Sequence, residues 1–242
     1  MKAKTLFFLQ ILAHCSVVPM MIYAEARHYA VGLFIHFLTG AFGMSMTYHR
    51  LMSHESWKSP RWFKIFGLFC GTIGLTGPCI AWAATHKRHH QFADTKRDPH
   101  SPLFLGALRV QFLSMFYSLG PSAIKPFVKD SIAVFFHRNY LHINFLYVGL
   151  LIFIDPFAVI YAYFFPAFLL WNTGSLINSL GHIWGYRNYQ TLDQSRNNPI
   201  LAILSYGEGW HNNHHRFPKS AYFGSKWYEF DISGVLIKIL RK

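Results

Sequence analysis

Histidine is the residue type in this chain whose number and spacing could do chemistry. The 242-residue sequence holds 15 histidines and only 10 acidic residues. Most of the histidines fall into four short strings, HRLMSH, HKRHH, NSLGH and HNNHH. These strings supply His49, His54, His86, His89, His90, His182, His211, His214 and His215. Neutral imidazole is a ligand for iron, zinc, copper and nickel, so the strings predict a metal centre.

The spacing inside the strings brings the imidazoles together on helices. Positions i, i+3 and i+4 share one face of an α-helix, so each HxxHH string presents three imidazoles on one side. Asn178 and His182 stand one turn apart in the same way. His49 and His54 are five residues apart, which on an ideal helix separates them by roughly 140°. They would therefore reach different metals, or lie where the helix unwinds.

The size of the set indicates two metal ions. Nine imidazoles exceed what one ion can coordinate, whereas two ions with four or five nitrogen ligands each would use them all. The remaining histidines stand alone, and a lone histidine in an apolar stretch is more often packed or hydrogen-bonded than a ligand. This interpretation applies to His14, His28, His36, His100, His137 and His142.

The elements that must position these strings are those of a membrane protein. Hydrophobic residues make up 52% of the chain and charged residues 14%, against roughly 25% charged residues in a soluble domain. This composition excludes a disordered chain, collagen and a coiled coil. The three cysteines are odd in number and follow no metal-binding spacing, so no disulfide framework is expected.

Four apolar segments are candidates to span a bilayer, which takes about 20 residues. We expect two helical hairpins, with spans at 5–23, 29–48, 139–154 and 157–177, of which the third is short. The segments 49–138 and 178–242 would form a helical cap. Residues 1–242 would then make a single, all-α integral membrane domain.

The distribution of charge orients these spans. Of 23 Lys and Arg residues, only Arg27 would lie in an outer connection. By the positive-inside rule, the cap and both termini are then cytoplasmic. The net charge of +13 reflects this topology, and no nucleic-acid partner is expected because no motif that reads DNA or RNA is present.

A centre built from all four strings constrains the chain between them. Only 31 residues separate His54 from His86, and two crossings would need about 40. The apolar stretch 62–84 should therefore not cross, and we expect a helix in or along the cytoplasmic cap. The mixed stretch 104–119, which holds Arg109, predicts a helix at the membrane interface.

One class of di-iron site is excluded. Carboxylate-bridged bundles need paired ExxH motifs. The two matches, at 25–28 and 208–211, would lie on opposite sides of the membrane and cannot form one site. A histidine-rich site for two metals remains.

The strings and their surroundings resemble the integral-membrane fatty acid desaturases of the Δ9 stearoyl-CoA type. The resemblance rests on HRLMSHESW, THKRHHQFADTKRDPHSP, NSLGHIWGYR and GEGWHNNHHRFP, of which the last is the most specific. It implies four transmembrane helices under a cytosolic helical cap that holds two non-haem iron ions. The ligands it implies are the nine histidines of the strings, and Asn178 matches a position that reaches one iron through water.

The resemblance also implies a reaction and its partners. Two hydrogens leave a saturated acyl chain with O2 as co-substrate, and a cis double bond forms, with Δ9 the expected position. The substrate would be a CoA thioester or a membrane lipid. Electrons would come from a separate donor, such as ferredoxin or cytochrome b5 with its reductase. The absence of an HPGG haem-binding string favours a bacterial enzyme of the inner membrane with a free-standing donor.

Several further side chains are candidates for roles around such a site. Cations of the cytoplasmic face would dock an acidic donor, or face lipid headgroups or the polar head of the substrate; these are Lys87, Arg88, Lys96, Arg97, Arg216 and Lys219. Asp94 and Asp98 are expected to bond ligand imidazoles. Arg50, Trp82 and Trp184 would line the acyl path or serve packing alone.

Two other functions stay open at this point. A fatty acid hydroxylase would use the same two irons, and its product gains an oxygen where a desaturase product loses two hydrogens. A metal or proton transporter should place its histidines within the spans near the membrane midplane. Only His14 and His36 clearly lie there, which argues against transport.

Overall fold

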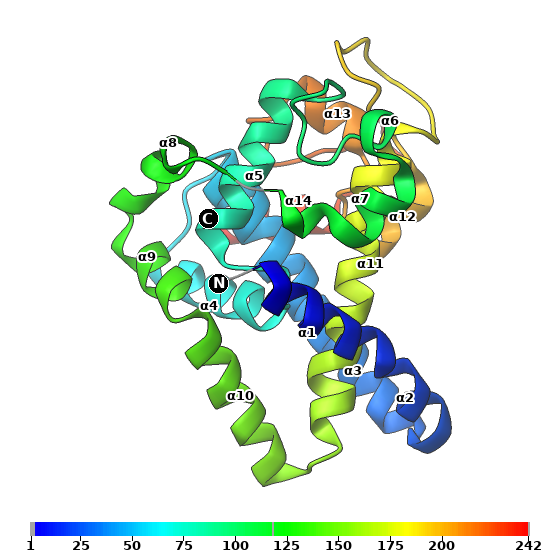
Figure 1. Cartoon of the computed structure of the whole chain (residues 1–242). Coiled ribbons are helices and arrows are strands. Elements are labelled where there is room, and N and C mark those ends of the chain that lie inside the picture. Colours follow the sequence, from blue (N-terminus) through cyan, green and yellow to red (C-terminus); the bar gives the residue numbers. More distant parts are fainter. Residues whose placement is uncertain (1–2, 118, 242) are drawn as a thin grey trace.

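The computed structural model describes residues 3–117 and 119–241, and within these ranges the chain is helical with no β-strand. Isolated bridges pair Asn197 with Tyr186 and with Trp210. Figure 1 shows α2, α3, α10 and the lower part of α11 projecting to one side of a second group of helices, which includes α5, α6 and α13. The expected all-α architecture is confirmed.

Three helical stretches are long and apolar enough to cross a membrane. The first, Ala3–Tyr23, consists of α1 (Ala3–Cys15) and α2 (Val17–Tyr23). The second, Ala26–Ser53, consists of α3 (Ala26–Phe37) and η1 (Leu38–Ser53). The third, Ile160–His182, runs through η4 (Ile160–Phe164), α11 (Phe165–Ser179) and η5 (Leu180–His182).

The remaining expected span is a shorter helix. It forms α10 (Tyr140–Ile154), which is apolar and 15 residues long. At 1.5 Å per residue, such a helix reaches about 22 Å, less than the ~30 Å hydrocarbon core. Asp155 ends it and bonds the backbone N–H of Phe157, which turns the chain back toward α11.

The second span changes its winding before it reaches the first histidine string. α3 is an α-helix, whereas η1 is a π-helix, whose hydrogen bonds run from i to i+5. The N–H of His54 donates to the carbonyl of His49 at 3.2 Å in this pattern. A π-helix brings residues five apart onto nearly the same face, which an α-helix would not do.

The stretch 62–84 is not one helix but two. α4 (Arg61–Ile73) and α5 (Cys79–Phe92) are separated by a turn at 74–78. Leu75 and Gly77 have positive φ angles of 58° and 103°, which no continuous helix accommodates. The break divides the stretch into helices of 13 and 14 residues, neither of which is among the candidate spans; that the stretch does not cross the membrane stays a prediction.

The stretch 104–119 also differs from the single helix expected. It holds the end of α6 (Pro102–Leu105), then α7 (Ala107–Leu113) and η2 (Ser114–Phe116); Ser118 lies outside the described residues. Gly106, with φ of 81°, breaks the helix between α6 and α7. α7 packs against α11, where the Gln111 side chain donates to Asn172 at 3.1 Å.

The rest of the cap consists of short helices. These are α8 (Pro121–Ile124), η3 (Lys125–Lys129), α9 (Ser131–Arg138), α12 (Pro199–Leu204), α13 (His211–Arg216) and α14 (Ile232–Leu240). Side-chain caps begin three of them, with Asp130 accepting from Ala133, Asn198 from Leu201 and Asp231 from Gly234. Such caps satisfy backbone N–H groups that have no partner within the helix.

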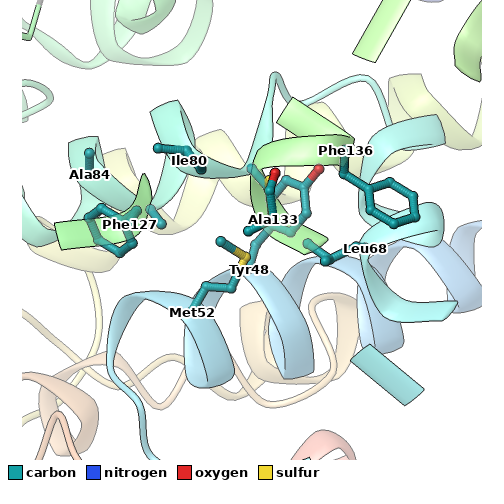
Figure 2. Packing of buried hydrophobic residues seen from close by; sticks show 10 residues of the cluster. Tyr48, Met52, Leu68, Ile80, Ala84, Phe127, Ala133 and Phe136 are labelled. Atoms are coloured by element: carbon teal, nitrogen blue, oxygen red, sulfur yellow. The ribbon is translucent and has the colours of Figure 1, made fainter. Parts of the chain in front are cut away.

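A buried hydrophobic cluster locks the two helices that carry the first two histidine strings. Tyr48 and Met52 of η1 pack there with Ile80 and Ala84 of α5, and residues from α4, η3 and α9 complete the cluster (Figure 2). Tyr48 is fully buried. This packed cluster therefore fixes the positions of η1 and α5, which carry His49 and His86.

Close approach of η1 and α4 depends on glycine. A Cβ atom added at Gly43 would lie 2.4 Å from the backbone N of Gly71, and one added at Gly71 would lie 2.3 Å from Tyr48. Small residues at a helix interface allow backbones to meet in this way. The end of the second span is thereby fixed against α4.

Candidate metal centre

The cap gathers the histidines of all four strings into two buried groups, each of which could hold a metal ion. The first group holds His49, His54, His86, His90 and His214, and the second holds His89, His182, His211 and His215. Within each group the candidate ligand atoms lie within 4.8 Å of one another. The adjacent residues His89 and His90 belong to different groups, and so do His214 and His215, so α5 and α13 each serve both.

The Nε2 atoms of the five-histidine group converge on one point. His54 and His86 are 2.8 Å apart at these atoms, and His86 and His90 are 3.0 Å apart. His214 lies 2.9 Å from both His49 and His90. Two imidazole nitrogens bonded to one metal at roughly 2.1 Å lie about 3.0–3.4 Å apart at angles of 90–110°. The spacing therefore fits a common ion.

The four-histidine group shows the same convergence. The Nε2 atoms of His89 and His215 are 3.3 Å apart, and those of His182 and His211 are 3.0 Å apart. His89, His182 and His211 are each at most 2% exposed. Nε2 atoms that carry a lone pair and no hydrogen cannot hydrogen-bond to one another. Burying several of them together is therefore costly unless a cation lies between them. The donor set and its burial fit a bound metal.

The π-helical winding of η1 resolves the spacing of the first string. His49 and His54 fall in the same group, with ring centroids 4.9 Å apart. They do not serve different metals, as an ideal helix would require. Their helix departs from α-helical geometry, the second of the two alternatives that the spacing leaves open.

Carboxylates hold the outer nitrogens of four of these imidazoles. His182 Nδ1 lies 2.7 Å from Asp94, and His89 Nδ1 lies 3.0 Å from both oxygens of Asp98. The predicted hydrogen bonds of these two acids to imidazoles of the strings are confirmed, whereas metal binding by these imidazoles stays a prediction. An Nδ1–H that donates to a carboxylate leaves the Nε2 lone pair free for a metal and fixes the orientation of the ring.

Two further carboxylates do the same from positions that the sequence analysis missed. Asp193 accepts from His215 Nδ1 at 3.0 Å, and Glu208 accepts from His49 Nδ1. Glu208 belongs to an ExxH motif that was considered only as a direct metal ligand. Asp193 lies in the loop between η5 and α12, 22 residues before its partner, where no local pattern marks it.

The two groups differ in their electrostatic surroundings. Three of the four ligands in the smaller group have carboxylate partners, whereas only His49 does in the larger group. Glu208 is also neutralised by Arg50, whose guanidinium reaches it at 3.1 Å. A cation in the four-histidine group would therefore have more negative charge around it.

Burial lowers the pKa of several of these imidazoles and thereby favours the neutral form that binds metals. It lowers the pKa of His54 to about 2 and holds the pKa values of His86, His89 and His90 well below the ordinary value of 6.5. Burial raises the pKa of Asp98 to about 6. Burial alone would also raise the pKa of Glu208, but His49 and Arg50 lower it to about 2.

Arg50 does not face an open path. Its side chain is fully buried and bonds Asp231 at 2.7 Å and Glu208 at 3.1 Å. It thereby ties the end of the second span to the start of α14. Of the other two residues considered for an acyl path, Trp82 stacks on His86 with rings 5.1 Å apart and 9° from parallel, and Trp184 is 56% exposed.

Four asparagines fix the last string, and the sequence analysis gave them no role. The side-chain Oδ1 of Asn197 accepts from the backbone N–H groups of Asn212 and Asn213. The Asn213 side chain donates to Glu229 and accepts from Asn197 and Asn188. These amides occupy one side of α13 while its histidines occupy the other, so the letters NN in HNNHH serve orientation.

The remaining predicted residues lie near the groups or apart from them. Asn178 is on α11, one turn before His182, and within the described chain no hydrogen bond involves its side chain; its contact through water stays a prediction. His100 packs 4.4 Å from the His89 ring beside Asp98, closer to the centre than expected for a lone histidine. His14 bonds Asn172, and His28 caps α3.

Comparison of the sequence with known proteins assigns the chain to one family. The family model described as fatty acid desaturase matches residues 27–231. The chain is 36% identical over 219 residues to Delta-9 acyl-lipid desaturase 1 of Arabidopsis thaliana, covering 85% of this chain and 70% of that protein. It is 32% identical over 247 residues to sn-1 stearoyl-lipid 9-desaturase of Anabaena variabilis, covering 98% and 89%. It is 33% identical over 226 residues to sn-2 palmitoyl-lipid 9-desaturase of Nostoc sp. (strain 36), covering 88% and 78%.

Proposed function

The chain belongs to the fatty acid desaturase family and is a fatty acyl desaturase, and we propose that it introduces a cis double bond at the Δ9 position of a saturated acyl chain. The observation that carries this proposal is the meeting of histidines from four distant strings in two adjacent buried groups. Three relatives named as 9-desaturases support the position of the double bond.

The two groups would each hold one non-haem iron. The five-histidine and four-histidine sets would supply the ligands, with Asn178 contributing through water to one of them. Iron bound there supplies the O2-dependent redox chemistry that an unactivated C–H bond requires. The chain itself holds each ligand ring in place through Asp94, Asp98, Asp193 and Glu208, and buries the site against bulk water.

We further propose that the chain crosses the membrane four times, with α10 as the short third span. The cap and both termini would face the cytoplasm, in a bacterial inner membrane. The excess of Lys and Arg on the cap side supports this orientation. The break at 74–78 also supports it, because the chain turns there and α5 carries His86 and His90 back to the group that holds His49 and His54.

The reaction requires partners that deliver substrate and electrons. Removal of two hydrogens balances when O2 takes up these hydrogens, two electrons and two protons to give two molecules of water. The acyl chain would enter as a membrane lipid or a CoA thioester. The electrons would come from ferredoxin, or from cytochrome b5 with its reductase.

Expression in a bacterial host that lacks its own desaturase tests the proposed function. We expect a new cis-Δ9 monounsaturated fatty acid in the lipids of cells that express the intact chain. Gas chromatography with mass spectrometry of derivatised methyl esters locates the double bond. His89→Ala, which removes one ligand of the four-histidine group, should abolish the product.

The alternatives give distinct outcomes in the same samples. An alcohol in place of the alkene would show a hydroxylase and refute the assigned reaction. A double bond at another carbon would retain desaturation and refute Δ9. Product from His89→Ala equal to that of the intact chain would refute the proposed ligand set.

A further inference from the structure

An open cleft adjoins the histidine groups at the end of the cap. It has a volume of about 680 Å³ and lies between α13 and the segment that follows it. Arg216, Lys219 and Tyr222 line it, together with Asn213 and Phe223. Figure 1 shows α13 at the end of the molecule opposite α2 and the tip of α10. A soluble protein can reach this cleft from the side away from the membrane-spanning helices.

The rim of the cleft is positively charged and lacks a balancing acid. Arg216 and Lys219 are exposed, and neither is among the cations that form ion pairs in the described part of the chain. The acids that follow in this segment, Glu229 and Asp231, are fully buried. Glu229 accepts from the Tyr186 hydroxyl and backbone N–H groups, and Asp231 pairs with a buried guanidinium.

Phe223 belongs to the lining of the cleft and also contacts the five-histidine group. Its ring centroid lies 4.3 Å from that of His214 and 5.5 Å from that of His49. The Arg50 guanidinium covers the same ring at 3.8 Å. The Phe223 ring is therefore buried and packed in place, in contact with the two imidazoles and with the guanidinium.

We propose that this cleft is the docking site of an acidic one-electron carrier protein, and that electrons pass from it through the contact of Phe223 with His214 and His49. The inference rests on the proposed function, which requires two electrons for each double bond. A carrier would deliver them singly and leave oxidised by one electron each time. A negatively charged face on the carrier would be complementary to Arg216 and Lys219, which accelerates encounter and fixes orientation.

Binding by the purified full-length protein tests the docking site without catalysis. The probe is oxidised plant-type [2Fe–2S] ferredoxin, titrated at low ionic strength into protein in detergent. We expect Arg216→Glu combined with Lys219→Glu to raise the Kd by about tenfold or more, because two attractive charges become repulsive. The matched control is Lys125→Glu with Lys129→Glu, which makes the same charge change on exposed residues of η3 and should change the Kd less than about twofold.

Three results would overturn the docking site. These are no binding of ferredoxin by the unaltered protein, an equal effect of both double variants, and an unchanged Kd in the Arg216 and Lys219 variant. If that variant raised only the KM for acyl substrate, the cleft would bind the polar head of the substrate. Because Kd is measured without turnover, a failure here is distinct from absence of an unsaturated product in cells.

Phe223→Leu tests the path from the cleft to the metal centre. We expect it to leave the Kd for ferredoxin and the iron content unchanged, while it slows oxidation of bound, reduced ferredoxin by the iron-loaded protein under O2 and substrate. Stopped-flow absorbance of the iron–sulfur cluster measures this rate. A rate equal to that of the unaltered protein, with Kd also equal, would refute the path through Phe223.

Discussion

Asp94 and Asp98 both accept hydrogen bonds from the four-histidine group, but replacement by asparagine should affect their hydrogen bonds differently. Asp94 Oδ2 accepts from His182 Nδ1 and from the backbone N–H of Gln194, each at 2.7 Å. Its other oxygen accepts from the Ser101 hydroxyl at 3.0 Å. A hydroxyl can turn and accept instead, so Asp94→Asn can keep all three contacts with its NH2 group toward Ser101. This variant removes the negative charge but not the hydrogen bonds.

Asp98 allows no such rearrangement. One oxygen accepts from the backbone N–H of His100 and the other from that of Asp94, and both lie 3.0 Å from His89 Nδ1. Every partner is an N–H donor, so an amide NH2 at either position would face a donor. The side chains of Asp98 and His89 are both fully buried, which prevents water from relieving the conflict.

We therefore expect Asp98→Asn to weaken iron binding far more than Asp94→Asn. Loss of charge assistance from a retained hydrogen bond costs about 1 kcal/mol, or roughly fivefold in affinity. If the bond is lost and a buried N–H is left facing another donor, the cost is about 2–3 kcal/mol, or roughly 30- to 160-fold in affinity. The measurement is iron bound per chain against free Fe(II) concentration, in purified protein in detergent.

The control for this comparison is Asp130→Asn. Asp130 caps α9 and pairs with Lys64, away from the histidine groups, so the same chemical change there should leave iron affinity unaltered. Thermal unfolding of the metal-free proteins checks that all three variants fold. Equal losses in Asp94→Asn and Asp98→Asn would refute the reasoning from donor and acceptor geometry, and so would a larger loss in Asp94→Asn.

Three other perturbations have defined outcomes. His89→Ala and His214→Ala each remove one histidine from one group only. Each should therefore lower the iron content in elemental analysis from about two ions per chain toward one. Loss of both ions from either variant would contradict two separable sites. Gly71→Ala should lower the free energy of unfolding by about 1–3 kcal/mol because its Cβ would meet Tyr48, whereas Gly149→Ala, with nothing within 4 Å, should not. Arg50→Met should destabilise the fold by about 3–5 kcal/mol, seen as a lower thermal midpoint, since it leaves two buried carboxylates without their cation.

Local spacing was enough to predict the residues that meet at the site. The HxxHH strings lie on α5 and α13, and both present their imidazoles on one side, as the i, i+3, i+4 rule requires. The contact of Asp98 with His89 was also predictable, because Asp98 follows that histidine by nine residues and a turn can fold it back. In these cases the interacting groups are near in sequence, and helix or turn geometry determines their contact. Asp94, by contrast, bonds His182, 88 residues along the chain, so only the tertiary fold selects its partner.

The breaks in the cap helices had a signal that the analysis of apolar length overlooked. The turn between α4 and α5 contains Gly74, Gly77 and Pro78, and the break before α7 is at Gly106. Glycine at positive φ and proline both interrupt helices. Hydrophobicity alone averages over such residues, so it predicted one continuous element where the chain forms two.

The sequence alone does not predict contacts between side chains that lie far apart along the chain. Glu208 is 159 residues from His49, and Arg50 reaches Asp231 across 181 residues. Neither acid follows a local spacing rule with its partner, because the contact exists only after the second span and the C-terminal segment have packed together. The same holds for the π-helix, whose wide turns no residue type specifies. Packing of η1 against α4 and α5, together with the bonds of Glu208 and Arg50, can offset the cost of that winding, which brings His49 and His54 into one group. The sequence strings therefore predict which imidazoles meet, whereas their convergence depends on the tertiary contacts behind them.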